Sequence, residues 1–158
     1  MATNRGKQFE AKFQEDWKVS FPGSFCLRLP DQQSGYYGTS RNICDFICFA
    51  NKTLFLIECK TIKGNTFPLG NFTQYDKMST VLEYPNVITG ILIWYCEKDK
   101  VVFVPLETYR KMLDAGEKSI NVRFLLDKYK EAGYTIIEIP SKKKRVFMDS
   151  DYTILLEE

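Results

Sequence analysis

Two carboxylates and an amine lie near the ends of two neighbouring apolar runs. Asp45 lies in the first run, and Glu58 and Lys60 lie at the end of the second. The short stretch 50–53 between the runs predicts a β-hairpin. If the hairpin closes on the two-residue turn 51–52, Asp45 lies directly opposite Glu58, with Cβ atoms about 5 Å apart. Residues two apart on a strand share a face, so Lys60 lies on the same face as Glu58.

Two carboxylates this close repel each other. In a site partly shielded from water, one of them must take up a proton unless a cation separates them. Oxygen ligands suit magnesium, with manganese as a substitute, and the peptide carbonyl of Cys59 is the third protein ligand that we consider. Such an ion polarises a phosphate and acidifies a bound water, while Lys60 can orient or deprotonate that water. These parts predict hydrolysis of a phosphodiester bond.

The same spacing also has a plain structural explanation. Glu-x-Lys on a strand is common as a surface ion pair, and a three-residue turn or a bulge would turn Asp45 away from Glu58. The apolar residues around the charges favour a functional site, because unpaired charges are normally excluded from such strands.

The composition limits the chemistry further. The chain of 158 residues contains no histidine. This excludes Ser-His-Asp and Cys-His catalysis, histidine-ligated zinc and nucleases with an imidazole base. The formal net charge of +2 is compatible with a localised positive cleft but not with a strongly basic DNA-coating protein.

The cysteines predict reduced core thiols in a cytoplasmic protein, because they are odd in number and lie in apolar runs without a C-x-x-C pair. They are Cys26, Cys44, Cys48, Cys59 and Cys96. Cys44 and Cys48 are expected to face one side of a strand, but two thiolates do not complete the tetrahedral site of zinc. No apolar run approaches ~18 residues, so we expect neither a secretion signal nor a membrane span.

The periodicity predicts a single α/β domain over residues 1–158, with a mixed sheet of about five strands. Helices are expected at residues 4–18, 71–83, 108–115 and 121–132. Strands are expected at residues 24–29, 43–49, 54–59, 87–97, 101–106 and 134–139. Loops are expected at residues 31–42 and 62–70, and a basic tail over residues 141–158.

Several blocks of the sequence are similar to a known nuclease family. Asp45 followed by Glu58-Cys59-Lys60 resembles the core of the PD-(D/E)xK nuclease superfamily, and the surrounding blocks resemble RecU-type Holliday-junction resolvases. The blocks share the order and spacing of the family's segments, and they comprise residues 4–10, 44–46, 58–61, 67–72, 102–107 and 118–120. The resemblance covers residues 4 to 140.

The resemblance implies a restriction-endonuclease-like fold and a magnesium-dependent homodimer that nicks opposing strands of a four-way DNA junction in recombination and repair. Asp45 and Glu58 would be metal ligands and Lys60 the catalytic amine. Glu10, on the first helix, would be an auxiliary acid, although it also suits the first turn of any helix. Gln74 would be the glutamine of the second helix, but it comes two residues earlier than in the family, where Asp76 is the alternative.

Other residues are candidates for contacts with DNA. The basic ones could hold phosphates or could simply be solvated, and they are Arg5, Arg28, Arg41 and Lys63. Tyr36 and Tyr37 could stack on unpaired bases at a branch point or could belong to an ordinary loop. Residues 31–42 are shorter than the stalk of typical RecU members, which bears on junction selectivity more than on catalysis.

Two other functions fit the same residues. One is a restriction-type or repair-type nuclease of the same fold that cuts ordinary duplex DNA. The other is a non-catalytic DNA-binding accessory of recombination proteins that kept the fold and lost the chemistry. The joint presence of Asp45, Glu58 and Lys60 argues against the accessory protein.

Overall fold

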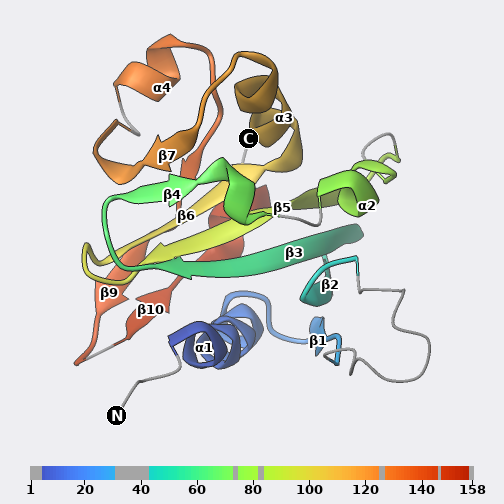
Figure 1. Ribbon diagram of the computed structural model, residues 1–158. Helices are drawn as coiled ribbons and strands as arrows, with labels where there is room; N and C mark the ends of the chain where they lie inside the picture. The colour runs from blue at the N-terminus through green and yellow to red at the C-terminus, as the bar shows by residue number, and fades with distance from the viewer. Residues whose placement is uncertain are drawn as a thin grey trace, which may run out of the picture.

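A mixed sheet of six strands lies at the centre of the computed structural model, which describes residues 5–30, 43–72, 75–81, 84–124, 127–145 and 147–156 (Figure 1). The strand order is β1-β2-β3-β5-β6-β8. The bounds of these strands are β1 Phe25–Arg28, β2 Phe46–Ala50, β3 Thr53–Ile62, β5 Val87–Tyr95, β6 Lys100–Pro105 and β8 Ile137–Glu138. Within this described sheet, only β3 and β5 pair in parallel. The predicted α/β class with a mixed central sheet is confirmed.

Helices and two small sheets surround the centre. The helices are α1 Arg5–Ser20, α2 Tyr75–Ser79, α3 Leu106–Asp114 and α4 Lys128–Glu131. The 3₁₀ turns are η1 Leu69–Asn71, η2 Val122–Phe124 and η3 Tyr152–Leu156. The small sheets pair β4 Thr66–Pro68 with β7 Ser119–Asn121, and β9 Ser141–Lys143 with β10 Met148–Ser150.

The first hairpin closes on the predicted two-residue turn. Asn51 and Lys52 both have positive φ, 51° and 62°. Positive φ at both central residues is the signature of a type I′ turn, whose twist matches that of the flanking strands. The strands pair with Phe46 opposite Ile57, which is the register that the sequence predicts.

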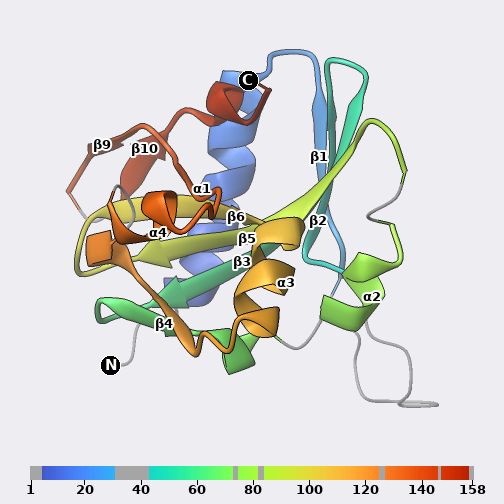
Figure 2. The same cartoon turned by 90° about the horizontal axis from the view of Figure 1, so that it is seen from above.

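The sheet lies between two helical layers. Figure 1 shows α1 below the sheet and α3 above it, and the view from above in Figure 2 places α2 and α3 on the side away from α1. The buried stripe of α1 consists of Phe9, Phe13 and Trp17, and it packs on one face of β3. The opposite face is covered by a second cluster that includes Met112 of α3.

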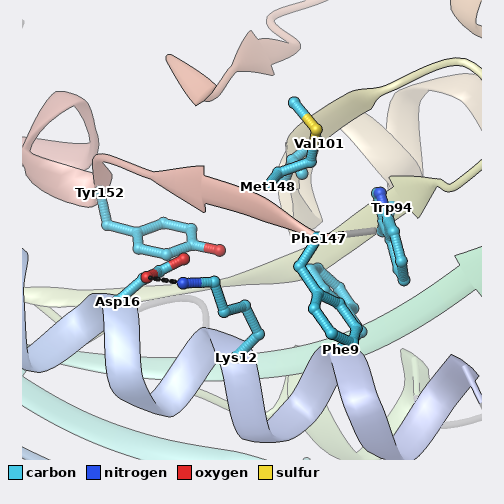
Figure 3. Close-up of a pocket in the computed structure, with 8 residues that line it drawn as sticks. All are labelled: Phe9, Lys12, Asp16, Trp94, Val101, Phe147, Met148 and Tyr152. Atoms are coloured by element: carbon cyan, nitrogen blue, oxygen red, sulfur yellow. Dashed lines mark hydrogen bonds and ion pairs between the residues drawn. The ribbon is translucent and has the colours of Figure 1, made fainter. Parts of the chain in front are cut away.

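The C-terminal residues fold against α1, although the sequence predicts only a basic tail there. Lys12 of α1 binds Asp149, with Nζ 2.6 Å from Oδ1, and also binds Asp16 at 3.0 Å. The Ser150 N–H donates to Oδ2 of Asp16 at 3.0 Å. Figure 3 shows Lys12 reaching Asp16 beside the ring of Tyr152, in a small pocket lined mainly by apolar side chains. These contacts attach the β9–β10 hairpin to the first helix.

Several predicted elements are shorter than expected. Within the described part of residues 71–83, the predicted helix is limited to α2, preceded by η1. The helix predicted over residues 121–132 is reduced to α4, because Asn121 pairs with Thr66 in the β4–β7 sheet. That sheet also replaces part of the loop predicted over residues 62–70. At the start of residues 121–132, pairing between residues distant in sequence overrides the local periodicity.

Among the residues that the structure describes, no helix is long and apolar enough to cross a membrane.

A close approach of strands β5 and β6 depends on Gly90. A Cβ atom at this position would lie 2.5 Å from Cζ of Phe103 and 2.5 Å from the backbone oxygen of Val104. We expect Gly90→Ala to lower the free energy of unfolding by about 2 kcal/mol or more, since the buried ring has no room to move. Gly64→Ala is the control, because nothing lies within 4 Å of its Cβ position. Urea unfolding of both variants tests this, and equal midpoints would contradict it.

Candidate active site

The hairpin of β2 and β3 brings the two predicted carboxylates together. Asp45 and Glu58 are the residues next to the last pair of the ladder, Phe46–Ile57, and the charge of Asp45 helps to raise the pKa of Glu58. Oδ2 of Asp45 accepts a hydrogen bond from the Cys59 N–H at 2.9 Å. The backbone oxygen of Asp45 also accepts from the Leu29 N–H at 2.8 Å. Asp45 is therefore fixed from both neighbouring strands.

Glu58 is the most unusual residue of the site. It is only 4% exposed, and its Oε1 has no hydrogen-bond partner among the described residues. Burial and the nearby charge of Asp45 together raise the pKa of Glu58 to about 7, although Lys60 opposes the shift. A buried carboxylate with a free oxygen beside a second carboxylate is costly for a folded protein unless something binds there.

Lys60 supplies the amine beside these carboxylates. Its Nζ lies 3.5 Å from Oε2 of Glu58, and its side chain is 29% exposed. The parallel pairing of β3 with β5 sets Lys60 beside Ile93 and Glu58 beside Ile91, both of which are fully buried. The amine is therefore held between a buried carboxylate and solvent.

Glu10 of α1 is a third carboxylate near the site. Arg28 of β1 binds its Oε1 twice, through Nη2 at 2.9 Å and Nε at 3.0 Å. The charge of Glu10 contributes to the raised pKa of Glu58 and to that of the buried Cys59 thiol. No sequence pattern predicts this ion pair, because its partners are distant in sequence and belong to different elements. Arg28, a candidate for phosphate contact, is thus engaged with Glu10.

The donor set fits a hard divalent cation. Asp45 and Glu58 adjoin the last pair of the β2–β3 ladder, close enough for the charge of Asp45 to raise the pKa of Glu58, and the Oε1 of Glu58 is unpartnered within the described chain. The Cys59 side chain belongs to the apolar core and burial raises its pKa well above the ordinary value, so only its carbonyl oxygen can serve as a ligand. In the described part of the chain, no three His, Cys, Asp or Glu side chains are arranged as a metal site. Two carboxylates with a carbonyl and waters remain the ligand set that fits.

The remaining candidates divide into two groups. Lys63 is exposed just after β3, Arg5 is half-buried at the start of α1, and Asp76 is exposed in the first turn of α2. The other candidates lie outside the described residues, and they are Tyr36, Tyr37, Arg41 and Gln74.

All five cysteines are free thiols, and all except the half-buried Cys96 are buried. The expectation that Cys44 and Cys48 share a face is wrong. Cys44 packs in the cluster on the α3 side of the sheet and Cys48 in the cluster on the α1 side. The reason is that β2 begins at Phe46, so Cys44 precedes the strand and does not follow its alternation.

The fold of this chain is similar to that of solved structures. No protein-family model matches the chain, and no curated protein matches it. A solved structure of Hjc, a Holliday junction resolvase of Archaeoglobus fulgidus, aligns with a TM-score of 0.49 and 18% sequence identity. The alignment covers 65% of this chain and 78% of that chain. This likeness concerns the path of the chain alone.

The burial of Glu58 predicts a site that is destabilising when no cation is bound. We expect Glu58→Gln to raise the free energy of unfolding in metal-free buffer by about 1 kcal/mol or more, because it removes a buried charge next to Asp45. Glu97→Gln, at an exposed position, is the control and should change stability by less than about 0.5 kcal/mol. Chemical unfolding in EDTA measures both, and a loss of stability in the Glu58→Gln variant would contradict the interpretation.

Proposed function

We propose that this protein is a divalent-metal-dependent endonuclease that hydrolyses phosphodiester bonds of DNA, with four-way junctions as its substrate. One observation supports the hydrolytic part: the charge of Asp45 acts on the buried Glu58, whose Oε1 is unpartnered among the described residues, and Lys60 lies 3.5 Å from Oε2 of Glu58. Two carboxylates and one amine are the groups that histidine-free phosphodiester hydrolysis needs.

Asp45 and Glu58 would hold magnesium, or manganese in its place, together with the carbonyl oxygen of Cys59. The ion would lower the pKa of a bound water and stabilise negative charge on the phosphate. The Cys59 N–H holds the Asp45 carboxylate in place. Glu58 orients the Lys60 amine, which donates a hydrogen bond to the attacking water or to a phosphate oxygen. Arg28 fixes Glu10 at the edge of the same site.

The choice of a branched substrate rests on the sequence blocks that resemble junction resolvases. Opposing nicks in a four-way junction need two active sites, so the proposal includes a homodimer. Exposed Lys63 and half-buried Arg5 would contact the DNA backbone without reading bases. The five free thiols favour a reducing compartment such as the cytoplasm, where recombination and repair proteins would be its partners.

Loss of the Lys60 amine should impair cleavage. Lys60→Ala should reduce single-turnover nicking of a synthetic four-way junction by about 100-fold or more, because the attacking water loses its orienting amine. Junction binding, measured by fluorescence anisotropy, should stay within about threefold, and the circular dichroism spectrum should not change. Lys98→Ala, in an exposed turn, is the control and should retain full activity. Normal nicking by the Lys60 variant would refute its role.

The same assay distinguishes the proposed substrate from its main rival. Mapping of the products on the junction and on its separate linear arms should show paired, symmetric nicks in the junction alone. Equal cleavage of the linear arms would identify a duplex-cutting nuclease. Absence of cleavage with either metal would favour a non-catalytic DNA-binding protein.

Loss of a proposed metal ligand should weaken cation binding. Titration calorimetry with Mn²⁺ should detect one site in the wild-type protein, and Asp45→Asn should weaken binding by about tenfold or more, since a neutral amide is a poorer ligand for a hard cation. Asp114→Asn, at an exposed position on α3, is the matched control and should bind as the wild type does. Unchanged binding by the Asp45 variant would exclude this carboxylate as a ligand.

A further inference from the structure

Two cysteines face each other across the first two strands of the sheet. Strands β1 and β2 are antiparallel, and Cys26 lies directly opposite Cys48. The Leu29 N–H donates to the Asp45 oxygen, which marks the pair Leu29–Asp45 as hydrogen-bonded. Because such pairs alternate along an antiparallel ladder, the pair three residues further along, Cys26–Cys48, is not hydrogen-bonded. Pairs of this kind have Cα atoms about 4.5 Å apart, within the range that a disulfide spans.

The side chains are also in place. The two Sγ atoms lie 3.1 Å apart, with the Cys48 thiol donating toward Cys26. Both residues belong to the apolar core between the sheet and α1, where Cys26 is 6% exposed and Cys48 is fully buried. The two sulfurs can therefore be joined without a change in the pairing of β1 with β2.

The position of β1 gives a reagent a route to this pair. Among the described strands, β1 is at the end of the central sheet, and it has only four residues. Its outward side chains are Phe25, which is 50% exposed, and Leu27, which is 54% exposed. Short edge strands open more readily than central ones. Opening of β1 uncovers Cys26 first, while Cys48 stays on a strand paired on its other side with β3.

We propose that Cys26 and Cys48 form an intramolecular disulfide by exchange with a small disulfide such as oxidised glutathione. The Cys26 thiol loses its proton and attacks one sulfur of glutathione disulfide, forming a mixed disulfide and releasing one glutathione. The Cys48 thiol loses its proton and attacks the Cys26 sulfur, forming the protein disulfide and releasing the second glutathione. The protein loses two protons and two electrons, and one glutathione disulfide becomes two glutathione thiols.

The bond would connect the strand that holds Arg28 to the strand that follows Asp45. Cys26 and Arg28 are two apart on β1 and so share the face toward α1, where Arg28 binds Glu10. The closed loop would also restrict the unfolded chain, so the oxidised protein should unfold at a higher temperature, by roughly 5–10 °C. This inference does not depend on the proposed nuclease activity.

Peptide mapping after incubation of the reduced full-length protein with oxidised glutathione tests the proposal. Two of the five thiols should be lost without any gain of glutathione mass, and peptides 19–28 and 42–52 should be joined. The second peptide also contains Cys44, so Cys44→Ala is the matched control and should keep the link. Cys48→Ala should abolish it. A dithiothreitol-reversible rise in melting temperature should accompany the bond in the wild-type protein.

Each other result would overturn the proposal. These results are five thiols that remain free, glutathione that stays attached to Cys26, a link through Cys44 or Cys59, and a lower melting temperature on oxidation. If the Cys48 variant fails to fold, mapping of the wild-type protein and of Cys44→Ala still decides the outcome.

Discussion

The structure depends on keeping the Glu58 carboxylate buried, although burial of a charge lowers the free energy of unfolding. Glu58 is 4% exposed, and burial next to Asp45 raises its pKa to about 7. A chain without a use for this charge would gain stability by replacing it with an apolar residue. The strands around Glu58 therefore have to keep this carboxylate beside Asp45 in spite of the unfavourable charge. Glu58 lies on the longest strand of the described sheet, which is paired on both sides.

That strand is β3, which pairs with β2 on one side and with β5 on the other. Its parallel pairing with β5 runs along most of its length, and the type I′ turn at Asn51 and Lys52 fixes the antiparallel side. A shift of either pairing by one residue would turn Glu58 into the α1 face of the core. The turn and the parallel ladder therefore keep Asp45 and Glu58 near each other, and the Cys59 N–H holds the Asp45 carboxylate.

The sequence predicted this part of the molecule well because the information is local. The two-residue turn, the apolar runs and the alternation of side chains place Asp45 opposite Glu58 without knowledge of other elements. The ion pair of Arg28 and Glu10 was not predictable, since it depends on how α1 packs on β1. The same holds for the C-terminal hairpin, whose Asp149 and Ser150 bind α1, and for β7, whose pairing with β4 replaces a helical pattern.

The edge strand β1 connects the locally determined β2–β3 hairpin with the contacts that depend on the packing of α1. One of its faces carries Arg28, which fixes Glu10, and Cys26, whose carbonyl oxygen accepts a hydrogen bond from the Gln14 side chain of α1 at 2.8 Å. The third carboxylate is thus held by an edge strand, whereas Glu58 lies on a strand that is paired on both sides. Loss of β1 from the sheet would remove the ion pair of Arg28 with Glu10 but leave the β2–β3 hairpin in place. The proposed disulfide at Cys26 would therefore act on the part of the site that the edge strand holds, and not on the hairpin that carries Glu58.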